Sequence, residues 1–309
     1  MAQLPDSLSP TPGDRGLGTT DRSALACSVA RAWTLFADMV EPLDLEATTR
    51  AKGLTAREII TPLGAWEDNR PLTQLLADAR RGIVGDHDQA GLVDAVREAH
   101  RGETPEAVRA AVRRQGAEIT AWLESPESHD DGQLPVASML GTLPLLTFLH
   151  ASTYPLATSA LDLEQAGAAV PNELLRLGLV GVLDTIGALA SRQGLHASLV
   201  AVTPTFAAGV GVVPGSWRTA ELDPAAGDVL GPRVEGPVRL LLDVTAGRAD
   251  VPRAMAGRHL VVHDIPGLMA LAPLVEQVPG IPGGAALNAS MRAVSAVGSL
   301  LRRMPFARG

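Results

Sequence analysis

The sequence contains few cysteines, few aromatic residues and almost no lysine. Cys27 is the only cysteine among 309 residues, which excludes a disulfide framework and a cysteine-based zinc finger. This usage suits a reducing compartment, and we expect a cytoplasmic location. Aromatic residues make up only 3% of the chain, so the core has to be built from leucine, valine and alanine. Lys52 is the only lysine among 26 basic residues, a bias typical of GC-rich codon usage.

Positive charge and long apolar runs are also scarce. The chain has 26 basic and 34 acidic residues, a net charge of −8, without a basic stripe, so nucleic acid is not an expected partner. No stretch reaches the roughly 18 uncharged apolar residues that a membrane span needs, and we expect no signal peptide. With 46% hydrophobic residues, the chain still has ample material for a core, which excludes disorder of the whole chain.

Residues 21–167 show only helical patterns. The first 20 residues, rich in proline and poor in large hydrophobic residues, predict a flexible tail. Leu25, Val29, Trp33, Phe36 and Val40 then recur at the spacing of one helix face. Further helices are expected from residue 55, where a capping box stands, at about 89–101, from residue 105 and at about 142–163. The length itself predicts two domains, at roughly 100–200 residues each.

Residues 171–303 mix helical and strand patterns. Helices are expected at 172–192, 236–247, 264–277 and 285–303, with a hinge at 278–284. Strands are expected at 196–203, 207–213, 217–222 and 258–264. The sequence therefore predicts an α+β protein: a four-helix bundle at 21–167, and a small C-terminal α/β sandwich-like domain with a mostly antiparallel sheet at 171–303. Because the strands carry small side chains, we expect an apolar cavity in the second domain.

Three stretches of sequence carry a resemblance to known proteins. They are residues 54–66 (LTAREIITPLGAW), residues 160–163 (ALDL) and residues 240–248 (LLLDVTAGR). The first two resemble motifs of the maleylpyruvate isomerase family, which is mycothiol-dependent and has a DinB-like four-helix bundle. The third is similar to a helix-end motif of the sterol-carrier-protein-like domain that often follows this bundle. Their order in one chain strengthens the resemblance.

The resemblance implies a divalent metal, usually zinc, held inside the bundle by three side chains. Such a metal would lower the pKa of a low-molecular-weight thiol such as mycothiol and orient it for isomerisation or S-transfer. In this chain the three ligand positions align with Pro62, Pro155 and Ser159. Proline cannot coordinate a metal and serine is a weak ligand, so we expect no metal site. The two prolines also predict kinks in their helices.

Four polar residues recur every four positions in the helix expected at 142–163. They are His150, Tyr154, Thr158 and Asp162, and this spacing places them along one helix face. A histidine, a phenol and a carboxylate on the inner wall of a bundle could hold a polar ligand or transfer protons. His150, Tyr154 and Asp162 are therefore the candidate catalytic residues. The alternative is a polar seam whose members only satisfy one another.

Two functions from different classes remain open. The first is a divergent thiol-dependent isomerase or S-transferase that works without the family's metal and possesses at most a thiol such as mycothiol as cofactor. The second is a non-catalytic binding protein that encloses a small apolar molecule in its C-terminal domain. Cys27 is either a nucleophile or, more commonly for such a residue, a small buried side chain. In both cases we expect a small-molecule partner.

Overall fold

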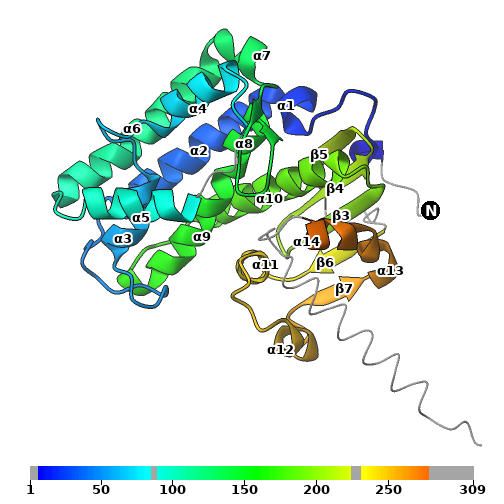
Figure 1. Cartoon of the computed structure of the whole chain (residues 1–309). Coiled ribbons are helices and arrows are strands. Elements are labelled where there is room, and N and C mark those ends of the chain that lie inside the picture. The colour runs from blue at the N-terminus through cyan, green and yellow to red at the C-terminus, as the bar shows by residue number, and fades with distance from the viewer. Residues whose placement is uncertain (1–5, 85–88, 224–230, 278–309) are drawn as a thin grey trace, which may run out of the picture.

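The computed structural model describes residues 6–84, 89–223 and 231–277. The first half of the chain is helical, and the second half combines a five-stranded sheet with helices (Figure 1). The expected α+β class is therefore confirmed. The hinge predicted at 278–284 and the helix predicted at 285–303 lie outside the described residues.

The helical half covers residues 6–166. Its elements in chain order are η1 (Asp6–Leu8), α1 (Leu17–Thr20), α2 (Arg22–Val40), α3 (Ala56–Ile60), η2 (Thr61–Leu63), α4 (Pro71–Arg80), α5 (Gln89–Ala99), α6 (Pro105–Glu124), α7 (Glu127–Asp131), β1 (Pro135–Val136), β2 (Leu143–Pro144), α8 (Leu145–Ala151), α9 (Thr153–Leu163) and η3 (Glu164–Ala166). Helix α2 packs against α6, α8 and α9. This packing is compatible with a helical domain, and the four-helix topology stays a prediction.

The local signals of the sequence explain how these helices begin. All five apolar residues of the predicted face of α2 are buried. Thr55 and Glu58 form the predicted capping box at α3, with the Thr55 amide donating to the Glu58 carboxylate at 2.8 Å. Thr104 caps α6 ahead of Pro105, where the missing amide hydrogen of proline costs nothing.

Pro62 and Pro155 lie close to interruptions of the helices that the sequence predicts. The helix predicted at 142–163 is split at Ser152 into α8 and α9, and Pro155 is the third residue of α9. A proline is tolerated there because the first amides of a helix have no intrahelical partner. Pro62 lies in η2, so the preceding helix α3 ends at Ile60. At both places the α-helical hydrogen-bond pattern is interrupted, while the backbone of Ser152 and Thr61 stays in the right-handed helical region.

The segment predicted as a flexible tail is packed against the second half over residues 6–20. Leu8 is fully buried. The Gly16 amide donates to the Trp217 carbonyl at 2.9 Å, and the Trp217 amide donates to the Asp14 carbonyl at 3.1 Å. The flexible-tail prediction is therefore wrong for this stretch. Composition misled because one leucine and backbone hydrogen bonds, rather than many apolar residues, hold the segment in place.

The second half contains one mixed sheet. Its elements are α10 (Asn172–Arg192), β3 (Ala197–Val202), β4 (Ala207–Val213), β5 (Ser216–Leu222), β6 (Arg233–Glu235), α11 (Val238–Thr245), α12 (Val251–Ala256), β7 (Val261–His263), α13 (Ile265–Leu268), η5 (Met269–Leu271) and α14 (Ala272–Gln277). The strand order is β5-β4-β3-β6-β7. Only the β3–β6 pairing is parallel among these described strands. The sheet is mostly antiparallel, as the sequence predicts, although the three-residue strand β6 was not expected.

Helix α10 is the shared core element of both halves. It packs against α2, α8 and α9 on one side and against β4 and β5 on the other. It is long and apolar enough to cross a membrane by length and composition, but 94% of its most apolar window is buried inside the protein, as the sequence predicts for an all-round apolar helix. One hydrophobic cluster includes residues from both halves. The boundary expected at residues 167–171 therefore divides the sequence without dividing the core.

Glycines let α10 approach its neighbours closely on both sides. A Cβ at Gly181 would lie 2.2 Å from the Thr153 hydroxyl oxygen, and a Cβ at Gly187 would lie 2.5 Å from Cδ1 of Trp217 and 2.6 Å from Cγ2 of Val210. No atom fits in such a gap, so the interface between α10 and β4–β5 is filled at this point. The apolar cavity expected in the C-terminal domain therefore does not extend to the contact of Gly187 with Trp217 and Val210, and elsewhere in the domain it stays a prediction.

We expect Gly187→Ala to lower the free energy of unfolding by about 1 to 3 kcal/mol, because the added methyl overpacks the contact with Trp217. This cost outweighs the roughly 1 kcal/mol that alanine gains over glycine in helix propensity. Urea denaturation measures the change. Gly102→Ala is the matched control, since nothing lies within 4 Å of a Cβ there. Equal stability of the two variants would contradict the close packing of α10.

Candidate functional site

The three predicted catalytic residues do not form one site. His150 belongs to α8, while Tyr154 and Asp162 belong to α9, and the helix break at Ser152 separates them. His150 faces Asp184 of α10, whereas Asp162 faces the arginines Arg50 and Arg248. The prediction of a single polar face is therefore wrong. It assumed a continuous helix, which Pro155 prevents.

His150 is part of a fully buried polar network around Asp184. Neither side chain is exposed, and Nδ1 of His150 lies 2.9 Å from Oδ2 of Asp184. Oδ1 of Asp184 accepts hydrogen bonds from Nε1 of Trp217 at 2.9 Å and from the Thr219 hydroxyl at 2.8 Å. A Cβ at Gly16 would lie 1.9 Å from the same carboxylate oxygen. The N-terminal segment thus covers the network, which links α8, α10 and β5 and is closed to solvent.

We expect Asp184→Ala to lower the free energy of unfolding by about 3 to 5 kcal/mol, because it leaves the buried donors of Trp217 and Thr219 and the His150 ring without their acceptor. Chemical denaturation measures the loss. Glu173→Ala is the control on the same helix, since Glu173 forms a half-exposed ion pair with Arg31, and such pairs contribute about 0 to 1 kcal/mol. A loss of similar size in both variants would show that Asp184 has no special role.

Tyr154 and Asp162 lie in a second polar group, here called the junction cluster, which consists of Arg50, Tyr154, Asp162, Asp243 and Arg248. Nη1 of Arg248 lies 2.7 Å from Oδ1 of Asp162, and Nε of Arg50 lies 3.6 Å from the same atom. Arg50 also donates to both carboxylate oxygens of Asp243, at 3.0 and 2.6 Å. The cluster therefore joins α9 and the loop before α3 to α11 and the turn that follows it.

Burial perturbs the ionisation of two groups in the junction cluster. It raises the pKa of the Asp162 carboxyl, and the charges and hydrogen bonds of Arg248 and Arg50 oppose this shift. It also raises the pKa of the Tyr154 phenol, against a hydrogen bond with Thr245 and the charge of Arg248. At neutral pH the phenol is a neutral hydrogen-bonding group near the guanidinium group of Arg248.

The junction cluster brings together two of the stretches that carry the family resemblance. Asp162 belongs to residues 160–163, and Asp243 and Arg248 belong to residues 240–248. The two stretches contact each other through the Asp162–Arg248 ion pair. Sequence reasoning picked both stretches as motifs, but it did not assign a site role to Arg50, Asp243 or Arg248. An arginine that follows a Thr-x-Gly turn was the available signal.

We expect Arg248→Met to destabilise the protein by about 1 to 2 kcal/mol at neutral pH, because the buried Asp162 carboxylate loses its closest cation. The pKa of Asp162 is raised in the folded state, so the native protein holds this proton more tightly than the unfolded chain. The contribution of Asp162 to the free energy of unfolding therefore falls as the pH rises from the ordinary aspartate pKa to the raised pKa of the folded state. The loss caused by Arg248→Met should shrink as the pH falls through this window, since a protonated Asp162 does not need a cation.

Denaturation midpoints measured from acid to neutral pH test this dependence. Arg113→Met is the matched control, because its partner Glu41 is exposed and an exposed pair contributes little at any pH. A loss for Arg248→Met that is constant over this range would contradict the coupling to Asp162.

The three positions at which the resemblance implies metal ligands do not offer a donor set. Pro155 is exposed on α9, Ser159 is half-buried on the same helix, and Pro62 is half-buried in η2. Within residues 6–84, 89–223 and 231–277, no group of three or more histidine, cysteine, aspartate or glutamate side chains is arranged to hold a metal ion. Proline lacks a donor atom in its side chain, so the residues at these positions do not fit a zinc ion.

Cys27 lies on the surface of the helical half. Cys27 is a free thiol, and it is exposed on α2, so its interpretation as a small buried side chain is wrong.

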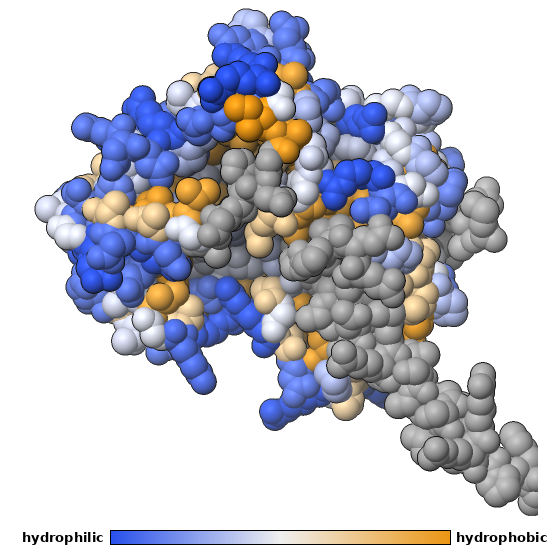
Figure 2. Space-filling view, viewed as in Figure 1, coloured by the Kyte–Doolittle hydropathy of each residue, from blue (hydrophilic) through white to orange (hydrophobic). Residues whose placement is uncertain are grey.

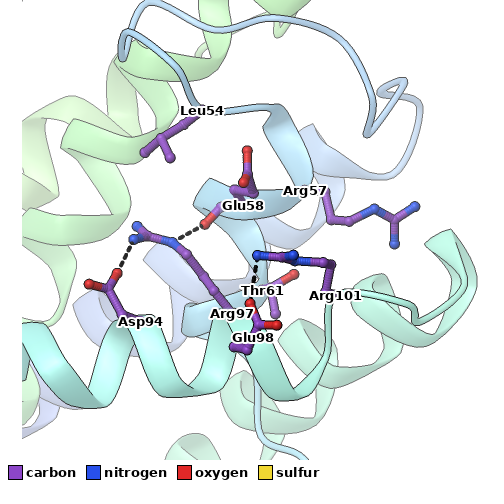
Figure 3. A pocket seen from close by; sticks show the side chains of 8 residues that line it. All are labelled: Leu54, Arg57, Glu58, Thr61, Asp94, Arg97, Glu98 and Arg101. Atoms are coloured by element: carbon purple, nitrogen blue, oxygen red, sulfur yellow. Dashed lines mark hydrogen bonds and ion pairs between the residues drawn. The ribbon is translucent and has the colours of Figure 1, made fainter.

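Hydrophilic side chains cover much of the helical half in the view of Figure 2. One cleft of about 260 Å³ lies on this half between α3–η2 and α5 (Figure 3). We call it the α3–α5 cleft, and Leu54, Thr61, Arg97 and Arg101 are among its lining residues. Sequence reasoning did not find it.

Comparison with known proteins gives only distant similarity. No family model matches the sequence, and no curated protein matches it either. A crystal structure of the mycothiol-dependent maleylpyruvate isomerase is 18% identical with a TM-score of 0.49, over 76% of this chain and 92% of that chain. A structure of a histidine-to-alanine mutant of such an isomerase is 17% identical with the same TM-score, over 82% of this chain and 96% of that chain. This similarity fits a distant relationship and leaves the family and the activity open.

Proposed function

We propose that the chain is a divergent relative of the thiol-dependent isomerases and S-transferases that has lost their zinc-dependent chemistry. The observation that carries the proposal is the junction cluster, in which the Asp162–Arg248 pair joins two stretches that resemble the family. The three former ligand positions are Pro62, Pro155 and Ser159, so no step through a metal is part of the proposal. The remaining polar groups at the junction would bind a small polar molecule.

The chemistry of the junction cluster suits a ligand with hydroxyl or carboxylate groups. The Tyr154 phenol is partly buried and stays neutral at physiological pH, because its pKa is raised, so it can donate or accept a hydrogen bond. Arg50 and Arg248 are partly exposed, at 38% of each side chain, and their guanidinium groups recognise carboxylates. A low-molecular-weight thiol such as mycothiol carries several hydroxyl groups and is the ligand we propose, with Tyr154 and Asp162 as its contacts.

The rival function is a binding protein that encloses an apolar molecule in the C-terminal domain. The close contact of Gly187 with Trp217 and Val210 leaves no space between α10 and the strands it covers at that point. No specific observation favours the rival function. The experiment below includes a result that would support it. We further propose a small-molecule partner and a cytoplasmic location, in line with the sequence.

We expect the protein, purified without a histidine tag, to bind mycothiol in isothermal titration calorimetry. Tyr154→Phe should weaken this binding about tenfold, because one hydrogen bond near a charged group is lost, with little change in melting temperature. Ser159→Ala is the control at a former ligand position and should bind like the wild type. Elemental analysis and melting curves with chelator complete the test.

Two results would contradict the proposal. One tightly held zinc ion per chain, lost on chelation together with a drop in melting temperature, would show that a metal site exists. A lipid that copurifies with the protein, without any binding of mycothiol, would favour the apolar-ligand function instead.

A further inference from the structure

The α3–α5 cleft contains a buried hydroxyl group without a partner. Thr61 is only 2% exposed and lines the cleft. Its carbonyl accepts a hydrogen bond from Nε1 of Trp66 at 3.2 Å, but its hydroxyl has no hydrogen-bond partner in the described part of the chain. Buried hydroxyl groups are nearly always hydrogen-bonded, because an unsatisfied one costs about 1 to 3 kcal/mol. The cleft is the place from which a partner for this hydroxyl can come.

Arg97 is held at the cleft with part of its guanidinium group available. Its Nε donates to the Glu58 carbonyl at 2.8 Å, and its Nη1 donates to Asp94 at 2.7 Å. These bonds fix the guanidinium group between α3 and α5, below Leu54, while the side chain of Arg101 ends next to Thr61 (Figure 3). Because no hydrogen bond of its Nη2 is found among the described residues, this group can donate to a molecule in the cleft.

The acidic side chains of the cleft do not block an anion. Asp94 and Glu98, the partners of Arg97 and Arg101, are 74% and 68% exposed. Ion pairs this exposed contribute little, so a ligand can displace them at small cost. The Glu58 carboxylate accepts a hydrogen bond from the Thr55 amide in the capping box of α3, and we expect it to stay there when a ligand binds. The cleft thus offers two guanidinium groups whose present partners are weakly held.

We propose that the α3–α5 cleft binds the carboxylate of a small organic acid. The carboxylate oxygens accept hydrogen bonds from the Thr61 hydroxyl and from Nη2 of Arg97, while Arg101 turns from Glu98 to the ligand. The short carbon chain of the acid packs beside Leu54, the apolar residue of the lining. A volume of about 260 Å³ lies just below the usual range of ligand pockets and has room for such an acid. This site goes beyond the proposed function, since it shares no residue with the junction cluster.

Titration of the full chain with butyrate, acetate and inorganic phosphate, followed by NMR, tests the proposal. We expect saturable shifts of the Thr61 amide and the Arg97 Nε–H signals, with butyrate binding more tightly than acetate. Thr61→Val removes the hydroxyl, keeps the shape of the side chain and should weaken butyrate binding about tenfold without loss of stability, because the hydroxyl has no partner in the free protein. Arg97→Gln should weaken binding at least as much. Arg81→Gln should not, because Arg81 is an exposed arginine at the C-terminal end of α4.

Each other outcome overturns the proposal. Butyrate affinity that is unchanged in Thr61→Val would mean that the hydroxyl only meets water. Equal weakening by Arg81→Gln would mean that butyrate responds to general charge. Saturation by phosphate but not by either carboxylate would assign the cleft to another class of anion, and the absence of saturable shifts with all three probes would mean that the cleft binds no small anion.

Discussion

The packing of the two halves against each other depends on the hydrogen bonds of the Asp184 carboxylate. This carboxylate lies in the middle of α10, without exposure to solvent, and its two oxygens meet groups from α8 and β5. A buried carboxylate is tolerated only when its hydrogen-bonding capacity is satisfied. The helical half supplies His150 and the sheet half supplies Trp217 and Thr219, so neither half alone completes this group. Hydrophobic contacts hold the halves together, and the carboxylate fixes their relative position.

Close packing of α10 explains why the candidate residues ended up in different environments. Glycines such as Gly181 and Gly187 bring the helix against α8–α9 and the sheet, which leaves His150 sealed in the core. Tyr154 and Asp162 lie beyond the helix break and reach the partly exposed junction with α11. The interruption at Ser152 therefore separates the fully buried His150 from Tyr154 and Asp162, which lie beside the partly exposed arginines of the junction cluster.

The sequence predicted the elements well where local signals decide them. The apolar face of α2, the capping box at Thr55 and the all-round apolar character of α10 follow from spacing and residue type alone. The strand β6 and the packed N-terminal segment could not be predicted, because each depends on a partner far away in the sequence. For the site, residue spacing found Tyr154 and Asp162 but placed them with His150, since a period of four assumes an unbroken helix. The place of Arg50 in the junction cluster and the α3–α5 cleft both depend on contacts between segments far apart in the sequence, which residue spacing does not show.

The packed N-terminal segment has a consequence for how the protein is made. Gly13 donates to the hydroxyl of Ser216, a partner 203 residues further along the chain, and Leu8 packs against Gly209. At a synthesis rate of about 5–20 residues per second, the ribosome completes β5 roughly 10 to 40 s after this segment has emerged. Until β5 has been synthesised, this segment therefore has no native partner. It can dock, and close over the Asp184 carboxylate, only after β4 and β5 have formed.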